Sequence, residues 1–493
     1  MKRSKFSLSY HKLLTCEMGD MVPIGLTEVL PGDSMQQATS LLIRVSPQLA
    51  PIMHPVHARI HHWFVPHRLV WDDWEDFITG GPDGNDDSVF PTVSLPYGVN
   101  KGTLSDYFGV PPGFGGLSVS ALPYRGYALI FNEWYRDQDL QLPVAISKAS
   151  GVDATTGTSL VQCSWEKDYF TSARPWPQKG DGVTISIGDT APVKSTGAAV
   201  KFGNVSGAGT AGDVSTDGSG NMQFQGVPAG SFVLEARDPT GYYADLSAAT
   251  SISINDLREA FALQRFQEAR ARFGSRYTEY LRYLGVRSSD ARLQRPEYLG
   301  GGKQTIQFSE VLQTGVTTDG DDQEGVGNLK GHGIGAMRSN RYRRFFEEHG
   351  YVISILSVRP KTIYAQGIPR HLSRRIKEDF FQKELQHIGQ QEILKKEIYA
   401  GVADLDATWG YQDRYDEYRR CESGIAGDFR DTLDFWHYAR LFAAAPTLNA
   451  DFVECNPTKR VYAEQTTHPL WIMAHHSIQA RRLVARSGSS FIY

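Results

Sequence analysis

Hydrophobic and polar residues alternate along residues 56–65, within the stretch VHARIHHWFVPHRLVWDDWEDF. In an extended chain every second side chain points to the same face, so alternate residues from Val56 onward would line one face of a strand. Pro66 cannot donate to a sheet ladder, and beyond it the apolar residues recur at helical spacing. The pattern predicts a half-buried strand that leads into a short helix. The residues expected to anchor the strand exit are Trp63, Pro66, Trp71 and Trp74.

Before this stretch, residues 1–55 are broken into loops by proline and glycine. Leu41 to Val45 is the only good strand expected there. Such an N-terminal arm would either cover its own domain or grip a neighbouring subunit.

After it, periodic segments are short and widely spaced. Tyr124 to Tyr135 predicts a short amphipathic element, and the apolar run Tyr351 to Val358 predicts a fully buried strand. Asn255 to Phe273 predicts a helix, and Arg374 to Tyr399 predicts a second one. Scattered strands with long connections are typical of a β-sandwich whose loops have grown larger than its strands.

Residues 182–230 differ from the rest of the chain because they hold many glycines and few charges. Alternation at Val183, Ile185 and Ile187 favours a small β-structured insertion over an unstructured loop, and a surface position is expected for it. The chain then divides into an arm with the first strand (1–55), the first part of the β fold (56–181), the insertion (182–230) and the second part with helical excursions (231–493).

Composition supports a β-rich globular protein, because 493 residues can bury a large core and include 48 glycines and 24 prolines. A net charge of −4 creates no global field that demands a nucleic acid or a membrane. The four cysteines show no CxxC spacing, which argues against a zinc module and fits a reducing compartment. The sequence has neither a signal-peptide core nor an apolar stretch of membrane-spanning length, so a soluble protein that is not secreted by a standard route is expected.

The strongest candidate for chemistry is a group of five histidines between His54 and His67. On one strand face, however, His57 and His61 would lie roughly 13 Å apart, too far to bind one metal ion together. Gly300 to Lys303 lacks the spacing of a phosphate loop, and Gly325 to Gly335 is interpreted as a flexible loop. We therefore expect no catalytic residues, no metal and no cofactor.

One segment of the chain is strongly basic. Between Arg338 and Lys377 there are ten basic residues against two acidic ones, with aromatic residues between the arginines. Such a surface suits nucleic acid, and the alternative is a set of ion pairs with acidic segments of neighbouring subunits. The candidate residues for contact with nucleic acid are Arg338, Arg341, Arg343, Arg344, Arg374 and Arg375.

Several blocks together resemble one protein family: WFVPHRLVWDDWEDF, ARLQRPEYLGGGKQTI, HGYVISILSVRP, QGIPR, GQQEILKKEIYAG, WGYQDRYDEYRR and PTLNADF. In this order they are similar to the major capsid protein of the Microviridae, in its gokushovirus-like branch. The resemblance covers almost the whole chain, although the C-terminal segment SIQARRLVARSGSSFIY has no match in it.

The resemblance implies an eight-stranded viral jelly roll with long loops and a few helices. It implies about sixty copies in an icosahedral (T=1) shell around single-stranded DNA, assembled in the bacterial cytoplasm. A small basic packaging protein, a minor pilot protein and a host receptor are the further partners it implies, without insertion into a membrane. The Gly-rich insertion would form the host-facing protrusion, and its candidate residues are Lys194, Lys201, Asp213 and Asp217.

A second hypothesis is a jelly-roll protein that binds or cleaves carbohydrate, because tryptophan and tyrosine are abundant in the loops. Cleavage would need a cleft with paired carboxylates, and no such pair stands out in the sequence. Binding to a glycan array and release of sugar would distinguish this hypothesis from a coat protein.

Overall fold

The computed structural model describes residues 3–183, 254–274, 276–314 and 328–486, together with the backbone of six short strands between residues 193 and 244. The chain divides into two compact units. The larger unit comprises residues 1–177 and 270–493, and the smaller one comprises residues 178–269.

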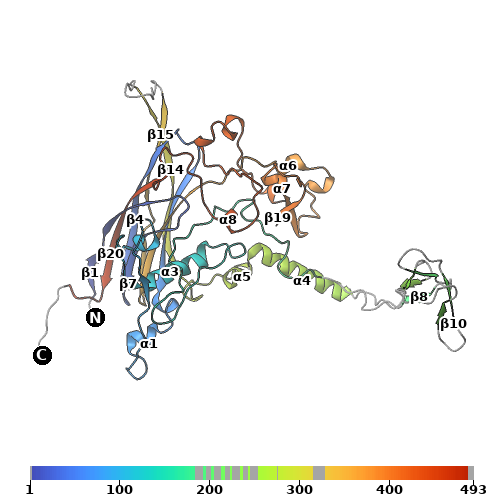
Figure 1. The fold of residues 1–493 in the computed structure, drawn as a ribbon. Coiled ribbons are helices and arrows are strands. Elements are labelled where there is room, and N and C mark those ends of the chain that lie inside the picture. Colours follow the sequence, from blue (N-terminus) through green and yellow to red (C-terminus); the bar gives the residue numbers. More distant parts are fainter. Residues whose placement is uncertain are drawn as a thin grey trace. The chain divides into compact units, whose positions relative to one another are not determined.

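The larger unit is built on a curled antiparallel sheet with eight strand positions (Figure 1). Four positions form what we call the first sheet, in the order β1 and β2, β20, β4, β15 and β16, where β1 and β2 share one edge of β20 and β15 and β16 share one edge of β4. Four more form the second sheet, in the order β14, β5, β17, β3, and the β14–β15 hairpin joins the two sheets. The strands of the first sheet are β1 (Ser4–Ser7), β2 (Tyr10–Cys16), β20 (Leu470–Arg482), β4 (Ser34–Gln48), β15 (Leu329–Arg338) and β16 (Tyr342–Phe345). Those of the second are β14 (Glu297–Leu312), β5 (Val56–Pro66), β17 (Gly350–Pro360) and β3 (Val22–Val29).

The two sheets enclose one apolar core. Ile43 and Ile472 of the first sheet belong to the same buried cluster as Ile60 and Leu356 of the second. β15 and β20 of the first sheet alternate between buried and accessible residues, because only their inner face is covered. A curled antiparallel sheet of this kind is a jelly roll, so the predicted fold class is confirmed.

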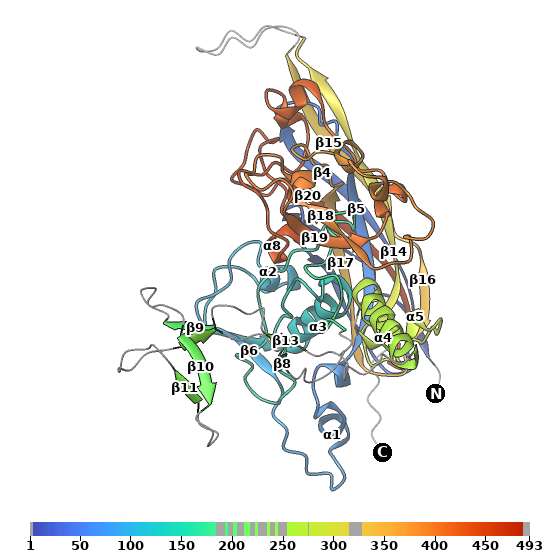
Figure 2. The ribbon, with the colours of Figure 1, turned by 90° about the vertical axis from the view of Figure 1, so that its right-hand side faces the viewer.

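The outer face of the second sheet is covered by a further layer. Trp63 and Ile353 pack there against Tyr124 and Tyr127 of α3 (Leu122–Ile130), and Figure 2 shows this helix in front of the strands. A π-helical turn, Phe131–Tyr135, continues α3. The layer therefore confirms the amphipathic element predicted at residues 124–135, and β17 is almost completely buried, as predicted for residues 351–358.

Short elements connect the strands. In the first half they are α1 (Trp74–Thr79), β6 (Thr92–Leu95), α2 (Leu104–Phe108), β7 (Leu117–Ser120) and α5 (Tyr277–Tyr283). In the second half they are α6 (Arg370–Ser373), β18 (Gln390–Leu394), α7 (Lys395–Ile398), β19 (Thr408–Asp413) and α8 (Ala450–Val453). None of the helices in the described part of the chain is both long enough and apolar enough to cross a membrane.

The stretch at residues 56–77 folds as predicted in outline. β5 ends at Pro66, a 3₁₀ turn follows at His67–Leu69, and α1 begins at Trp74. The helix starts later than the periodicity suggests, because the 3₁₀ turn occupies its expected first residues.

Three predictions for local structure are wrong. Residues 1–55 form four strands of the barrel, not a loop-rich arm with one strand at Leu41–Val45. Arg374–Tyr399 is no helix but a succession of a 3₁₀ turn, a strand and the single turn α7. Most of the segment Gly325–Gly335 is strand β15, and only its first part lies outside the described residues.

The glycines of β15 explain the third error. Gly331, Gly333 and Gly335 occupy the buried positions of an alternating strand. A Cβ atom at Gly331 would lie 2.5 Å from the carbonyl oxygen of Ala50, and one at Gly333 would lie 2.7 Å from a methyl carbon of Val45. These positions are glycines because the neighbouring chain approaches too closely for a side chain.

The C-terminal segment without a match in the resemblance has a structural role in its first part. Residues 477–482 belong to β20, which pairs with β4 on one side and with β1 and β2 on the other. The last described strand of the chain, β20, therefore lies inside the first sheet and not at its edge.

The smaller unit contains β8 (Val193–Ser195), β9 (Lys201–Asn204), β10 (Gly212–Thr216), β11 (Met222–Phe224), β12 (Leu234–Ala236) and β13 (Tyr242–Ala244). They pair as a four-stranded and a two-stranded sheet, which fits the β-structured interpretation of the insertion. The strand expected near Ile185 and Ile187 lies outside the described residues. The helix predicted at residues 255–273 is confirmed as α4 (Ile254–Phe273).

Candidate nucleic-acid interface

None of the described helices lies over the outer face of the first sheet, and α3 and α7 lie on the other side of the barrel (Figures 1 and 2). Strand register defines which side chains occupy this face. Trp471 of β20 lies opposite Arg44 of β4 and Thr15 of β2, and Arg44 lies opposite Ile334 of β15. Every second residue on each strand shares this orientation.

Basic residues recur at these outward positions. The register places there Lys5, Arg44, Arg338, Arg343 and Arg481, with the stacked histidine pair His11 and His475, whose ring centroids are 4.4 Å apart. None of the outward-facing positions on the described strands of the first sheet is occupied by aspartate or glutamate. The whole chain is nearly neutral, so the positive charge of this face is a local property.

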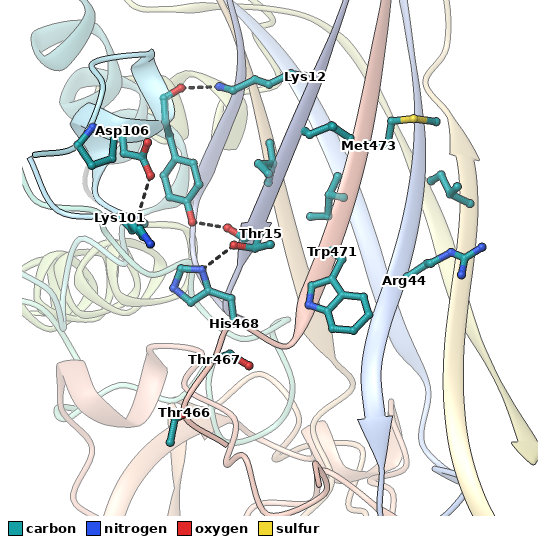
Figure 3. Close-up of a pocket in the computed structure, with 17 residues that line it drawn as sticks. Lys12, Thr15, Arg44, Lys101, Asp106, Thr466, Thr467, His468, Trp471 and Met473 are labelled. Carbon is teal, nitrogen blue, oxygen red and sulfur yellow. Dashed lines mark hydrogen bonds between the residues drawn. The ribbon is translucent and has the colours of Figure 1, made fainter. Parts of the chain in front are cut away.

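Large apolar side chains lie among the cations. Leu13 is 78% exposed, Trp471 44%, Met473 42% and Ile334 39%. Trp471, Met473 and Arg44 line a hollow of about 770 Å³ beside β2 and β20 (Figure 3). An exposed indole next to arginine is a surface on which nucleic-acid bases stack.

Hydrogen bonds hold the rim of this hollow in place (Figure 3). The hydroxyl of Tyr107 donates to the carbonyl oxygen of Thr15 at 2.7 Å, and the Thr15 hydroxyl lies 3.1 Å from Nδ1 of His468. Lys12 donates to the carbonyl oxygens of Pro23 and Tyr107, and burial lowers its pKa to about 8. Asp106 accepts from the backbone N–H of Gly102 at 2.8 Å, so the one carboxylate at the rim is already bound.

The six arginines predicted to contact nucleic acid differ in position and in ion pairing. Arg338, Arg341 and Arg343 are exposed at the end of β15 and on β16, and they form no ion pair with another described residue. Arg344 pairs with Glu297 at 2.7 Å. Arg374 lies on a different element, pairs with Glu417 at 3.4 Å and has its guanidinium 4.4 Å from the ring centroid of Tyr418. Arg375 is exposed next to it. The first three remain available to nucleic acid or to a neighbouring subunit, whereas Arg344 and Arg374 pair within the chain, which neither alternative predicted.

Comparison with known proteins identifies the family of the chain. A family model described as capsid protein (F protein) matches residues 1–490. The chain belongs to this family of phage capsid proteins.

Relatives named capsid protein VP1 support the same assignment. The protein of Bdellovibrio phage phiMH2K is 39% identical and covers 92% of this chain and 88% of its own length. Those of Chlamydia phage 1 and Spiroplasma virus 4 are 34% and 32% identical; they cover 94% and 92% of this chain, and 91% and 87% of their own length. The resemblance to Microviridae capsid proteins is confirmed, and this chain is a major capsid protein of a small phage.

The histidines of this capsid protein have partners other than a metal. Nδ1 of His61 lies 2.6 Å from the Tyr135 hydroxyl, and Nδ1 of His62 lies 2.8 Å from the Ser354 hydroxyl. Burial lowers the pKa of His54, His61 and His67 to about 4 and that of His62 to about 3. Within the described ranges no group of three His, Cys, Asp or Glu residues is arranged to hold a metal ion.

The predicted anchor residues of the strand exit are packed to different degrees. Trp71 is completely buried, and its indole N–H donates to Ser150 at 2.8 Å. Trp63 is 4% exposed, with its ring centroid 4.7 Å from that of Trp134. Pro66 is buried, and Trp74 is half-buried with its ring 4.5 Å from His67.

For the candidate host-facing residues of the insertion, the structure gives the position of the backbone and not of the side chains. Lys194 lies in β8, and Lys201 of β9 pairs with Asp213 of β10. Asp217 lies outside the described residues.

Sequence reasoning missed the centre of the capsid protein's cationic face, namely Arg44, Trp471 and Arg481. A signal was present, because Leu470, Ile472 and Ala474 alternate with accessible residues along β20. Trp471 was missed because residues 470–476 were not interpreted as a strand, and Arg481 because the segment from Ser477 onward was judged by its lack of a match and not by its periodicity.

Proposed function

We propose that this major capsid protein forms a closed icosahedral shell of about sixty copies, with the outer face of the first sheet turned towards packaged single-stranded DNA. The observation that carries the proposal is the cationic face without outward carboxylates, in which exposed Trp471 lies beside Arg44. Phosphates would contact the arginines and bases would stack on the indole. Enclosing the genome is a structural task that needs no catalytic group.

The charge of this face also bears on the other partners. A small basic packaging protein would contact the DNA and not this face, because like charges disfavour a direct contact. The insertion at residues 182–230 would present the host-facing protrusion that meets a receptor, and a minor pilot protein would occupy another site. Assembly would take place in the bacterial cytoplasm, which fits four cysteines that are all free thiols.

The test compares particles formed by the native chain with those of a variant that combines Arg338→Gln, Arg341→Gln and Arg343→Gln. We expect shells of normal size by electron microscopy, with the DNA per particle reduced by about half or more, since each phosphate contact contributes to affinity. Arg292→Gln, which removes an exposed arginine outside the first sheet, is the matched control. Unchanged DNA content in the triple variant would contradict the proposed orientation, and a chain that forms no shell under any condition would contradict the capsid function.

A further inference from the structure

A second hollow, of about 590 Å³, opens on the outer side of the second sheet. It is lined by residues of β5, the π-helical turn, the loop at residues 164–167, β14 and β17. Since the two sheets pack face to face, this hollow and the cationic face of the first sheet lie on opposite sides of the barrel. Nothing described above assigns a role to it.

Aromatic rings form its walls. The Trp63 ring centroid lies 4.7 Å from that of Trp134 and 5.0 Å from that of Tyr298. His61 lies 5.7 Å from Tyr298 and 5.8 Å from Tyr135. Tyr298 is 47% exposed, so part of this aromatic surface remains open to a ligand.

Cations outnumber carboxylates at the rim. Arg59 and Lys303 both contact the same oxygen of Glu166 at 3.1 Å, and Arg359 lines the hollow as well. Lys167 is bound to Asp137. Arg359 donates to the carbonyl oxygen of Ser164. Apart from Lys167, three basic side chains line the hollow with one carboxylate, that of Glu166, which leaves an excess of positive charge for an anion.

Trp165 provides an independent sign of a missing partner. Its side chain lines the hollow and is 3% exposed, yet its indole N–H has no hydrogen-bond acceptor among the described residues. A buried donor without an acceptor is destabilising, so such groups usually meet a ligand or a water molecule.

We infer that this hollow binds an acidic sugar, a carboxylated or phosphorylated pyranose of a bacterial surface glycan. The C–H face of the ring would pack on Tyr298 and Trp134, and its acidic group would contact Arg59, Lys303 and Arg359. A hydroxyl group would meet the second ring nitrogen of His61, and Trp165 would form part of the wall. The choice of a glycan over a nucleotide rests on the proposed function, because a first sheet turned to the genome leaves this side of the barrel facing away from DNA.

Binding is measured on native particles by saturation-transfer NMR, with galacturonic acid and glucose 6-phosphate as probes. Neutral glucose and thymidine monophosphate serve as comparison ligands. We expect at least one acidic sugar to bind at millimolar concentration and about tenfold more tightly than glucose. No binding of either acidic sugar, equal binding of glucose, or tighter binding of thymidine monophosphate would overturn the assignment.

Two surface variants locate the site without disturbing the core. Tyr298→Ala and Lys303→Gln should each weaken the acidic sugar about tenfold, whereas Tyr298→Phe should retain binding. Tyr97→Ala, at a tyrosine that is 99% exposed and outside the hollow, is the control. Loss in the control as well, or unchanged binding in both variants, would contradict the site. All these particles should keep their DNA, so a failure here is distinguishable from a failure of the proposed DNA face.

Discussion

Two histidines lie inside the barrel and illustrate how single residues tie the two sheets together. His62 of the second sheet contacts the hydroxyls of Ser354 and Ser339 through its two ring nitrogens, at 2.8 and 3.2 Å. His476 of the first sheet contacts the Thr39 hydroxyl at 2.9 Å and donates to the carbonyl oxygen of Ile24 at 3.0 Å. Both are fully buried, and burial lowers the pKa of His62 to about 3 and that of His476 to about 4.

These pKa values predict a loss of stability in acid. An unfolded histidine binds a proton near pH 6.5, whereas the folded protein keeps both rings neutral well below that pH. Stability is therefore complete above about pH 6.5 and falls towards pH 4 by about 1.4 kcal/mol per pH unit for each histidine. Thermal unfolding of the chain, measured between about pH 7.5 and about pH 4.5, should show a shallower pH dependence for His62→Gln than for the native protein. Parallel curves would contradict this explanation.

Trp471 is the residue on which the DNA face can be tested most directly. Stacking on an aromatic side chain contributes about 1–3 kcal/mol per base, and Trp471 is exposed on a strand whose inner neighbours are unaffected by its loss. Trp471→Ala should reduce the packaged DNA and lower the temperature at which particles release it, whereas Trp471→Tyr should stay close to the native protein. Identical DNA content and release in Trp471→Ala would show that bases do not stack there.

At the scale of elements, two tryptophans follow the end of β5, and both were predicted from the sequence to anchor it. They differ in how deeply they are buried. Trp71 is fully buried, while Trp74 in α1 is half-buried. Trp71→Ala should lower the free energy of unfolding by about 3–5 kcal/mol, the usual cost of deleting a large buried side chain. Trp74→Ala should cost clearly less, as measured by chemical unfolding of the unassembled chain. Equal losses would mean that α1 is packed more tightly than its exposure indicates.

The same element shows why some of the fold could be predicted and some could not. β5 and β17 are apolar enough to be recognised, because each has at least one face rich in large hydrophobic residues. β15 was misinterpreted because three of its four buried positions are glycines, and at Gly331 and Gly333 the neighbouring backbone and side chains leave no room for a side chain. β1 and β2 were missed because β1 has only four residues and Lys12 interrupts the inward face of β2. Both are edge strands, stabilised by pairing with β20 more than 450 positions away.

For the molecule as a whole, periodicity alone predicted no more than a β-sandwich with long loops. The resemblance to a known family was needed to predict the viral jelly roll. The candidate site was harder, since it consists of alternate residues on strands far apart in sequence. Arg338, Arg341 and Arg343 were found because they cluster along the chain, whereas Arg44 and Arg481 join them only through strand register. The aromatic hollow on the outer side of the second sheet could not be predicted either, because its residues are also far apart in the sequence.

The first and the last residues of the smaller unit contact each other, and this allows a decisive deletion. The side-chain amide of Gln178 donates to that of Gln267 at 2.9 Å, and the backbone N–H of Lys179 lies 3.5 Å from the carbonyl oxygen of Gln267. The chain therefore enters and leaves the unit at adjacent points, and a short Gly-Ser linker can replace residues 180–266 without stretching the barrel.

If the insertion serves the host and not the shell, this deletion should yield particles of native diameter with native DNA content that no longer adsorb to host cells. A milder variant, in which a linker replaces only residues 182–230, should give the same result and serves as the control for the position of the cuts. Electron microscopy and an adsorption assay measure the two properties separately. Loss of particles in both variants would show that the insertion holds subunits together, because both deletions leave every strand of the barrel in the chain. Normal adsorption of intact particles would instead assign host contact to the barrel, where the aromatic hollow is the site to examine.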